Sequence, residues 1–116
     1  MMLVMHSQST KVAIAVGAAA TIAGAGVQAV ATVQEFGSRL FRGPDAMGLL
    51  YVANWRAAAS TVQALRAGDV RNTMFVLADG FHLGTRRQAE ARAGVLHAGA
   101  DDVQFWPIDS REVAAR

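Results

Sequence analysis

"KVAIAVGAAATIAGAGVQAVATVQ", residues 11–34, is the stretch on which the fold depends. From Val12 to Val33 it contains 22 residues without a charge, and Gln28 is its one strongly polar side chain. As a helix, 22 residues extend about 33 Å, which is enough to cross a hydrocarbon core of roughly 30 Å. We therefore predict a mainly α fold class, with a long apolar transmembrane helix at the N-terminus and a small helical or βα-type C-terminal region.

Small side chains dominate this helix, whereas Leu, Ile and Phe favour insertion into a membrane most strongly. They recur at every fourth position, a spacing that lets another helix approach closely. The first row consists of Ala13, Gly17, Thr21 and Ala25, and Ala20 and Gly24 form a second pair. The pattern predicts that these six residues pack against other protein.

The apolar stretch has two other interpretations. It has the layout of an export signal, because Lys11 precedes the apolar run and "AVA" at residues 29–31 suits a cleavage site. Since the chain retains its start at Met1, we do not expect cleavage. Alternatively, the stretch is a packing helix buried in protein, inside a phage or secretion particle.

Charge divides the chain into two parts. Lys11 is the only charged side chain before Glu35, and from there onward charges recur every few residues. This change predicts an N-terminal membrane span within residues 1–35, a connector at residues 36–44, and a small, mostly helical domain at residues 45–116.

The charges beside the apolar stretch orient the predicted span. Arg39 and Arg42 follow it, whereas Lys11 alone precedes it. Because cytoplasmic flanks carry the excess of basic residues, we expect a single-pass membrane protein whose C-terminal part is cytoplasmic. On the particle interpretation, the protein would instead lie in a virion or a secreted particle.

Residues 45–67 have the spacing of a helix, and Gly68 is a fitting stop. Residues 73–79 are ambiguous. Met74–Ala78 is a continuous apolar run, as in a buried strand, but the apolar residues around it also recur at helical intervals from Val70. We favour a helix there, because the surrounding sequence is helical, and keep the strand as the alternative.

Residues 85–98 form a further predicted helix, with Thr85 at its N-terminus and Gly99 at its end. Pro107 indicates an extended segment just before it. If residues 73–79 are a strand, they form one βαβ unit with this helix and a second strand at residues 103–108. Two parallel strands cannot bury both of their faces, so a partner chain would have to complete that sheet.

Composition excludes several classes of function. The 116 residues include no Cys, which rules out disulfides and thiolate metal sites. The net charge is +2, but the basic residues are interleaved with acids and form no stripe, so we expect no nucleic-acid partner. The expected partners are other subunits of a protein complex and a lipid membrane, together with further copies of the chain.

"ADGFHLGTRRQ", residues 78–88, is the one stretch that resembles a binding site. His82, Arg86 and Arg87 lie beside a predicted helix N-terminus, where a phosphate or carboxylate can bind. The glycines match no phosphate-binding motif, so solvated arginines are the simpler interpretation. Trp55 and Trp106 are candidate interface anchors. No arrangement of residues predicts a catalytic residue, a metal site or a cofactor.

These observations favour a small, non-catalytic subunit that anchors or stabilises a larger, membrane-associated assembly through its small-residue helix. A structural component of a phage or secretion particle is the first alternative. A small α/β anion-binding module or enzyme, acting through the residues around His82, is the second.

Overall fold

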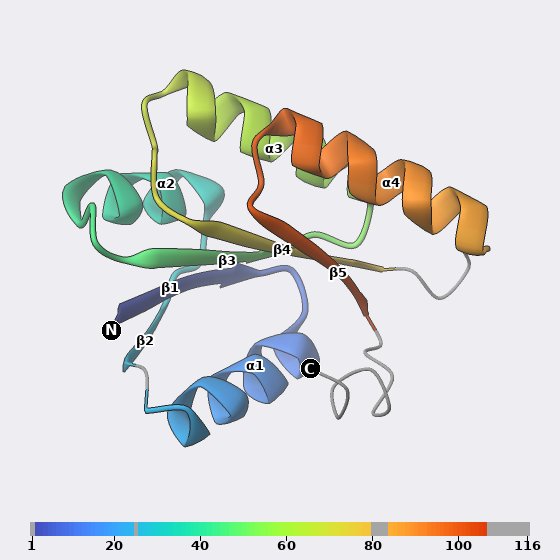
Figure 1. The fold of residues 1–116 in the computed structure, drawn as a ribbon. Coiled ribbons are helices and arrows are strands. Elements are labelled where there is room, and N and C mark those ends of the chain that lie inside the picture. The colour runs from blue at the N-terminus through green and yellow to red at the C-terminus, as the bar shows by residue number, and fades with distance from the viewer. Residues whose placement is uncertain (1, 25, 80–83, 107–116) are drawn as a thin grey trace.

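Strands and helices alternate along the chain. The computed structural model describes residues 2–24, 26–79 and 84–106. In this part all strands are parallel and form one sheet of order β2-β1-β3-β4-β5 (Figure 1). The elements are β1 Met2–Ser7, α1 Thr10–Ile22, β2 Gly26–Ala29, α2 Val33–Arg42, β3 Met47–Tyr51, α3 Trp55–Ala67, β4 Met74–Asp79, α4 Thr85–Ala98 and β5 Asp102–Trp106.

The sheet lies between two unequal layers of helix. Helix α1 covers one face, and α2, α3 and α4 cover the other (Figure 1). The larger part of the core lies on the three-helix side, where Phe36, Leu40 and Leu50 are fully buried. On the other side, Val12 of α1 packs with Tyr51 and Leu77 of the sheet.

The apolar stretch is not one helix, so the predicted fold class is wrong. Helix α1 ends at Ile22, and Gly24 follows with a φ of +80°, which a helix cannot continue through. The chain then enters β2 at Gly26. Of the two glycines that suggested close helix packing, Gly17 lies within α1, whereas Gly24 forms the turn between the helix and the strand. In the described ranges, no helix combines the length and apolar character that a membrane crossing requires.

The helix predicted for residues 45–67 is a strand followed by a shorter helix. The apolar run of β3 is buried between the two helical layers, so it needs no polar face. Helix α3 begins only at Trp55, because the side chain of Asn54 accepts hydrogen bonds from the backbone N–H groups of Arg56 and Ala57. The residues whose spacing predicted a single helix belong to two elements, β3 and α3.

Residues 74–79 form strand β4, so the preference for a helix there is wrong. The alternative is the arrangement found, since β4, α4 and β5 make a βαβ unit. A partner chain is not needed to complete its sheet, because β3 of the same chain pairs with β4. The predicted connector at residues 36–44 is mostly helix α2.

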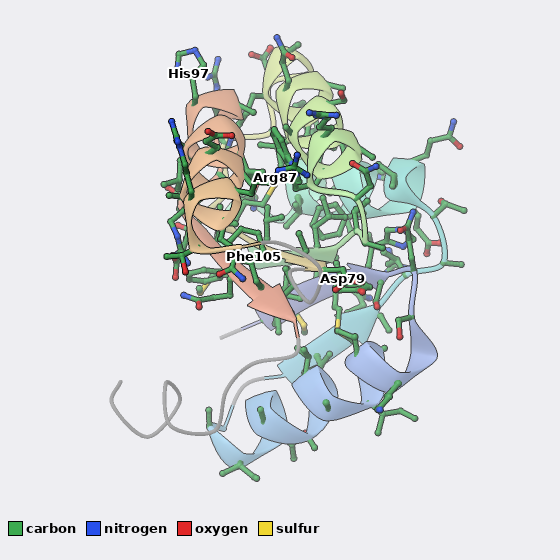
Figure 2. The ribbon with its side chains drawn as sticks, turned by 90° about the vertical axis from the view of Figure 1, so that its right-hand side faces the viewer. Asp79, Arg87, His97 and Phe105 are labelled. Atoms are coloured by element: carbon green, nitrogen blue, oxygen red, sulfur yellow. The ribbon has the colours of Figure 1, made fainter. Side chains whose placement is uncertain are left out.

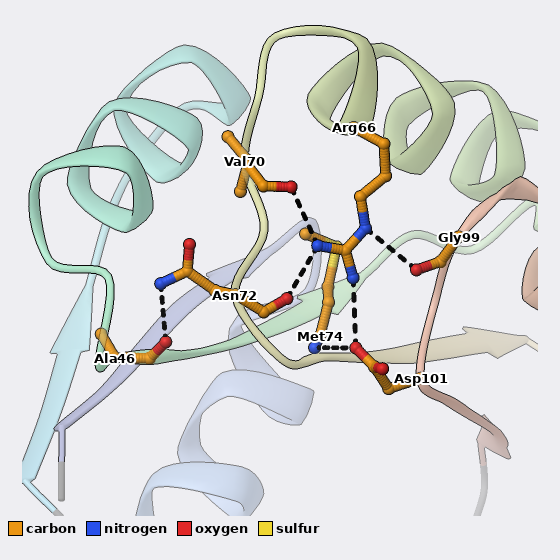
Figure 3. A network of polar contacts seen from close by, with 7 residues as sticks. All are labelled: Ala46, Arg66, Val70, Asn72, Met74, Gly99 and Asp101. Atoms are coloured by element: carbon orange, nitrogen blue, oxygen red, sulfur yellow. Dashed lines mark hydrogen bonds and ion pairs between the residues drawn. The ribbon is translucent and has the colours of Figure 1, made fainter.

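A polar network holds the edge of the sheet at which β4 and β5 begin (Figure 3). The guanidinium of Arg66 donates to the carbonyl oxygens of Val70, Asn72 and Gly99, at 2.8–3.0 Å. It also pairs with the carboxylate of Asp101 at 3.1 Å. That carboxylate accepts the backbone N–H of Met74 at 2.8 Å. The network has a structural role, because it fixes the entry of both strands beside the end of α3.

Candidate functional site

The strand order places a crevice between the carboxyl ends of β1 and β3. Their crossovers run to opposite faces of the sheet, and ligands of open α/β folds usually bind at this point. In this chain Gln8 bridges the crevice. The side-chain oxygen of Gln8 accepts the backbone N–H of Ala53 at 3.2 Å. The backbone N–H of Gln8 donates to the carbonyl oxygen of Tyr51 at 3.3 Å.

The residues around this crevice carry no charge. Ser7 ends β1, and Gln8 and Ser9 follow it. Ser9 caps α1 by accepting the N–H of Val12. Val52, Ala53 and Asn54 follow β3. In the described part of the chain, Asp79 at the end of β4 is the one carboxylate that a strand contributes to this edge.

A hollow of about 660 Å³ lies next to the crevice, between the β3–α3 connection, the end of β4 and α4. Arg56 lies over the ring of Trp55, 5.2 Å from its centre. Figure 2 shows Asp79 at the edge of the sheet, with Arg87 above it on the side of the helices. The lining residues are Ala53, Asn54, Trp55, Arg56, Asp79, Arg87 and Glu90.

Charges of both signs meet in this hollow, and they balance. Glu90 lies 3.9 Å from the guanidinium of Arg86, one turn earlier on α4. The pKa of the Tyr51 hydroxyl is raised above its usual value. Burial of the tyrosine is the main cause, and the negative charge of Asp79 adds to it. A hollow with such mixed charges suits a polar protein surface as well as it suits a small ligand.

The predicted anion-binding residues separate in the structure. Arg87 lines the hollow, whereas the side chain of Arg86 is 95% exposed and faces Glu90. His82 lies outside the described residues. Anion binding by these residues stays a prediction.

The two candidate interface anchors also lie apart. Trp55 is half-buried between α3 and α4, where a Cβ added at Gly94 would lie 2.9 Å from its ring. Trp106 ends β5, and its side chain lies outside the described part. Both assignments stay predictions.

The six predicted helix-packing residues do not share one helix. Ala13 and Gly17 are half-buried on α1, and Thr21 is exposed near its end. Gly24 lies in the turn after the helix. Ala20 lies on α1 without a described side chain, and Ala25 is outside the described residues. Contact of this row with another protein stays a prediction.

Sequence reasoning did not single out Gln8, Asn54 or Arg56. The helix boundaries needed to find the first two were assigned wrongly, because the prediction placed no strand before residue 73. An available signal was Asn54 itself, since Asn after an apolar run is a common helix N-cap.

The described residues of the carboxyl edge offer few ligands for a magnesium ion. Mg²⁺ is usually held by one or two carboxylates together with phosphate oxygens and water. Between residues 2 and 106, with the gaps already given, no three acidic or histidine side chains gather closely enough to hold a metal. Amide, methyl and hydroxyl groups occupy the β1 and β3 ends instead.

Comparison with known proteins identifies the fold. No protein-family model and no curated protein matches the sequence. The BeF3-activated receiver domain of Klebsiella pneumoniae RstA superposes with a TM-score of 0.72, at 15% identity over 100% of this chain and 94% of that one. A CheY-like protein, TadZ of Pseudomonas aeruginosa, gives 0.69 at 15% identity over 99% and 94%. The receiver domain of TorR, from the TMAO respiratory system, gives 0.67 at 20% identity over 99% and 91%.

These findings correct the predicted function and location. Both the membrane anchor and the particle component require a long apolar helix, and the stretch at residues 11–34 forms α1, a turn and β2 instead. The single-pass membrane location is wrong for the same reason. The structural neighbours are receiver domains, which are signalling modules rather than anchoring subunits. In the residues that the structure describes, the chain is a five-stranded parallel α/β domain with the CheY-like receiver fold.

Proposed function

We propose that this chain is a signalling module that acts through contact with protein partners, without catalysis and without accepting a phosphoryl group at its β1–β3 crevice. The similarity to receiver domains supports the signalling role. The uncharged residues around the β1–β3 crevice support the proposal that no phosphoryl group is accepted there.

Phosphoryl transfer to a protein needs an acceptor and a means to neutralise charge. A carboxylate acceptor works beside a divalent cation or cationic side chains, which offset the negative charge of the phosphoryl oxygens. After β3 this chain has Val52 and Ala53, which offer no nucleophile. At the end of β1 it has Ser7, followed by Gln8, and neither of these residues is acidic.

The bridging glutamine also closes the space that a phosphoryl group would need. The Gln8 side chain spans from β1 to the backbone N–H of Ala53, which is the kind of donor that would otherwise bind a phosphate oxygen. This neutral hydrogen bond joins the connections that follow β1 and β3. The module we propose is constitutive, and its partner recognises this one conformation.

Beryllium fluoride, which mimics a phosphoryl group, tests the proposal. We expect no change in the amide NMR spectrum of the chain when beryllium fluoride and Mg²⁺ are added, and no added phosphoryl mass after incubation with acetyl phosphate. The RstA receiver domain, which BeF3 activates, serves as the positive control under the same conditions.

Saturable shifts at Gln8, Ala53 or Asp79 would show that the edge binds a phosphoryl group, and the proposal would then be wrong. An Asp79→Asn variant, measured in the same titration, identifies whether the single strand-end carboxylate is responsible. Loss of the shifts in that variant would assign the acceptor.

A further inference from the structure

The two edges of the sheet differ in how they are protected. At the β5 edge, two side chains form hydrogen bonds with the backbone groups of Val103. The guanidinium of Arg92 donates to its carbonyl oxygen, and the carboxylate of Asp102 accepts its N–H at 2.9 Å. Arg92 also lies over the ring of Phe105, 5.5 Å from its centre. Another strand cannot pair with these groups of Val103, which protects this edge.

The β2 edge has no such protection. Its residues, "GVQA" at 26–29, include no charge and no proline. The N–H of Val30 donates inward to the carbonyl of Met5 at 2.9 Å. Because successive residues of a strand direct their backbone groups to opposite sides, Val27 and Ala29 direct theirs outward. No side chain of the described ranges bonds to them, so this edge is open to pairing.

An exposed apolar helix surface adjoins the open edge. Helix α1 packs on β1 and β2 alike. Its outer surface carries Ile14 and Ile22, which are 68% and 88% exposed. Lys11, at the opposite end from Ile22, is its only charge. Helix and edge strand thus form a continuous uncharged surface, and such surfaces mark interaction sites.

We propose that this surface, made of α1 and β2, binds a second copy of the chain around a two-fold axis. The two β2 strands would pair antiparallel and extend the sheet across the axis, which is perpendicular to it. That axis keeps both α1 helices on the same face of the joined sheet. The proposal does not depend on the proposed signalling function.

The dimensions of the sheet fit this arrangement. Neighbouring strands lie about 4.8 Å apart. A helix over the gap between β1 and β2 therefore lies about 5 Å from the two-fold axis, and the two α1 axes come about 10 Å apart. Packed helices are usually 8–10 Å apart. The small side chains on α1, such as Gly17 and Ala18, permit this approach.

A second copy fits better than a single peptide strand. A peptide would cover the β2 edge alone, whereas a second copy supplies an edge and an uncharged helix together. Charge favours it as well, since no side chain from residue 12 to 34 is charged and the two Lys11 residues lie at opposite ends. Like copies are therefore not repelled at this surface.

The size of the surface predicts a weak dimer. Helix α1, with 13 residues, is about 20 Å long. With the strand beside it, the strip covers on the order of 400 Å² per copy, about half of the roughly 800 Å² per partner of a standard stable interface. We expect a concentration-dependent equilibrium between monomer and dimer.

Sedimentation equilibrium of the full chain over a range of concentrations tests this proposal. We expect dimers at the highest concentrations. Ile22→Lys and Ala29→Lys place a charge on the helix and on the strand edge, and each should weaken dimerisation by at least about tenfold. A lysine in the last turn of α1 suits the helix dipole, so Ile22→Lys should not destabilise the monomer.

Phe41→Lys is the matched control, because Phe41 is an apolar residue in the last turn of α2 and is 62% exposed. It should leave the dimer unchanged. The proposal is overturned if the chain stays monomeric at all concentrations, or if Phe41→Lys disrupts the dimer and Ile22→Lys does not. Thermal unfolding of each variant confirms that it is folded.

Discussion

Tyr51 connects the buried side of α1 with the carboxyl edge. It is the only tyrosine of the chain and is 6% exposed, packed against Val12 and Leu77. Burial raises the pKa of its hydroxyl, and the charge of Asp79 raises it further. Because the folded-state pKa lies above the unfolded value, the unfolded chain loses this proton first as the pH rises. Tyr51 therefore stabilises the fold fully below about pH 10, and this contribution falls at higher pH.

A spectroscopic titration can isolate this group, since no other residue forms tyrosinate. We expect the ultraviolet absorbance of tyrosinate in the native protein to appear at higher pH than in denaturant, where the midpoint is about 10. Asp79→Asn removes the neighbouring charge and should lower the native midpoint. Tyr51→Phe should reduce the loss of unfolding free energy above pH 10. A native midpoint equal to that in denaturant would contradict the burial of the hydroxyl.

Two glycines show how closely the elements pack. At Gly48 of β3, an added Cβ would lie 2.9 Å from both Phe36 and Leu40 of α2, which are fully buried and have no room to move. Gly48→Ala should therefore lower the free energy of unfolding by about 1–3 kcal/mol. At Gly17 of α1 nothing lies within 4 Å. Gly17→Ala should raise it by about 0.5–1 kcal/mol, because alanine favours a helix interior.

Chemical denaturation of both variants measures these changes. The same substitution is expected to act in opposite directions on the two sides of the sheet, so each variant is the control for the other. A neutral Gly48→Ala would mean that α2 can shift away from β3, and the close contact would then not limit the packing.

The sequence predicted an element correctly where it contained a recognisable signal at each end of that element. The helix predicted over residues 85–98 is α4 with the same bounds, and Gly99 ends it as expected. Thr85, predicted as its N-cap, is instead its first residue, and Gly84 is the N-cap. The helix at residues 45–67 failed because β3 and α3 are separated by only Val52, Ala53 and Asn54. Apolar residues on both sides of so short a connection can match a helical period by chance.

The apolar stretch failed for a different reason. Its composition suits both a helix and a buried parallel strand, since strands covered on both faces have no polar alternation. The turn between α1 and β2 depends on one residue, Gly24, among several glycines of the same stretch. Local sequence does not distinguish a glycine that packs from a glycine that turns.

The candidate site depends on the whole molecule, which is why the sequence revealed so little of it. Gln8 and Ala53 meet because β1 and β3 are neighbours, although 45 positions separate them. Arg56 and Arg87 approach one hollow from two helices. Such pairings follow from the strand order, and the order was inaccessible once β1, β2 and β3 were assigned to helices. Of the predicted site residues, Trp55 and Arg87 line the hollow. Arg87 belongs to α4, the helix whose bounds were predicted correctly.

The unequal layers predict how the whole molecule opens. Strands β3 and β4 have a neighbour on each side and lie beneath the larger core, whereas β2 has one neighbour and α1 contributes only a small cluster. In dilute protein, we expect the amides of α1 and β2 to exchange hydrogen faster than those of β3 and β4, because local opening costs less than global unfolding. Raising the concentration should slow exchange in β2 if two copies pair there, and Ala29→Lys should remove that change. Equal protection of α1, β2 and β3 in dilute protein would instead mean that both layers unfold as one unit.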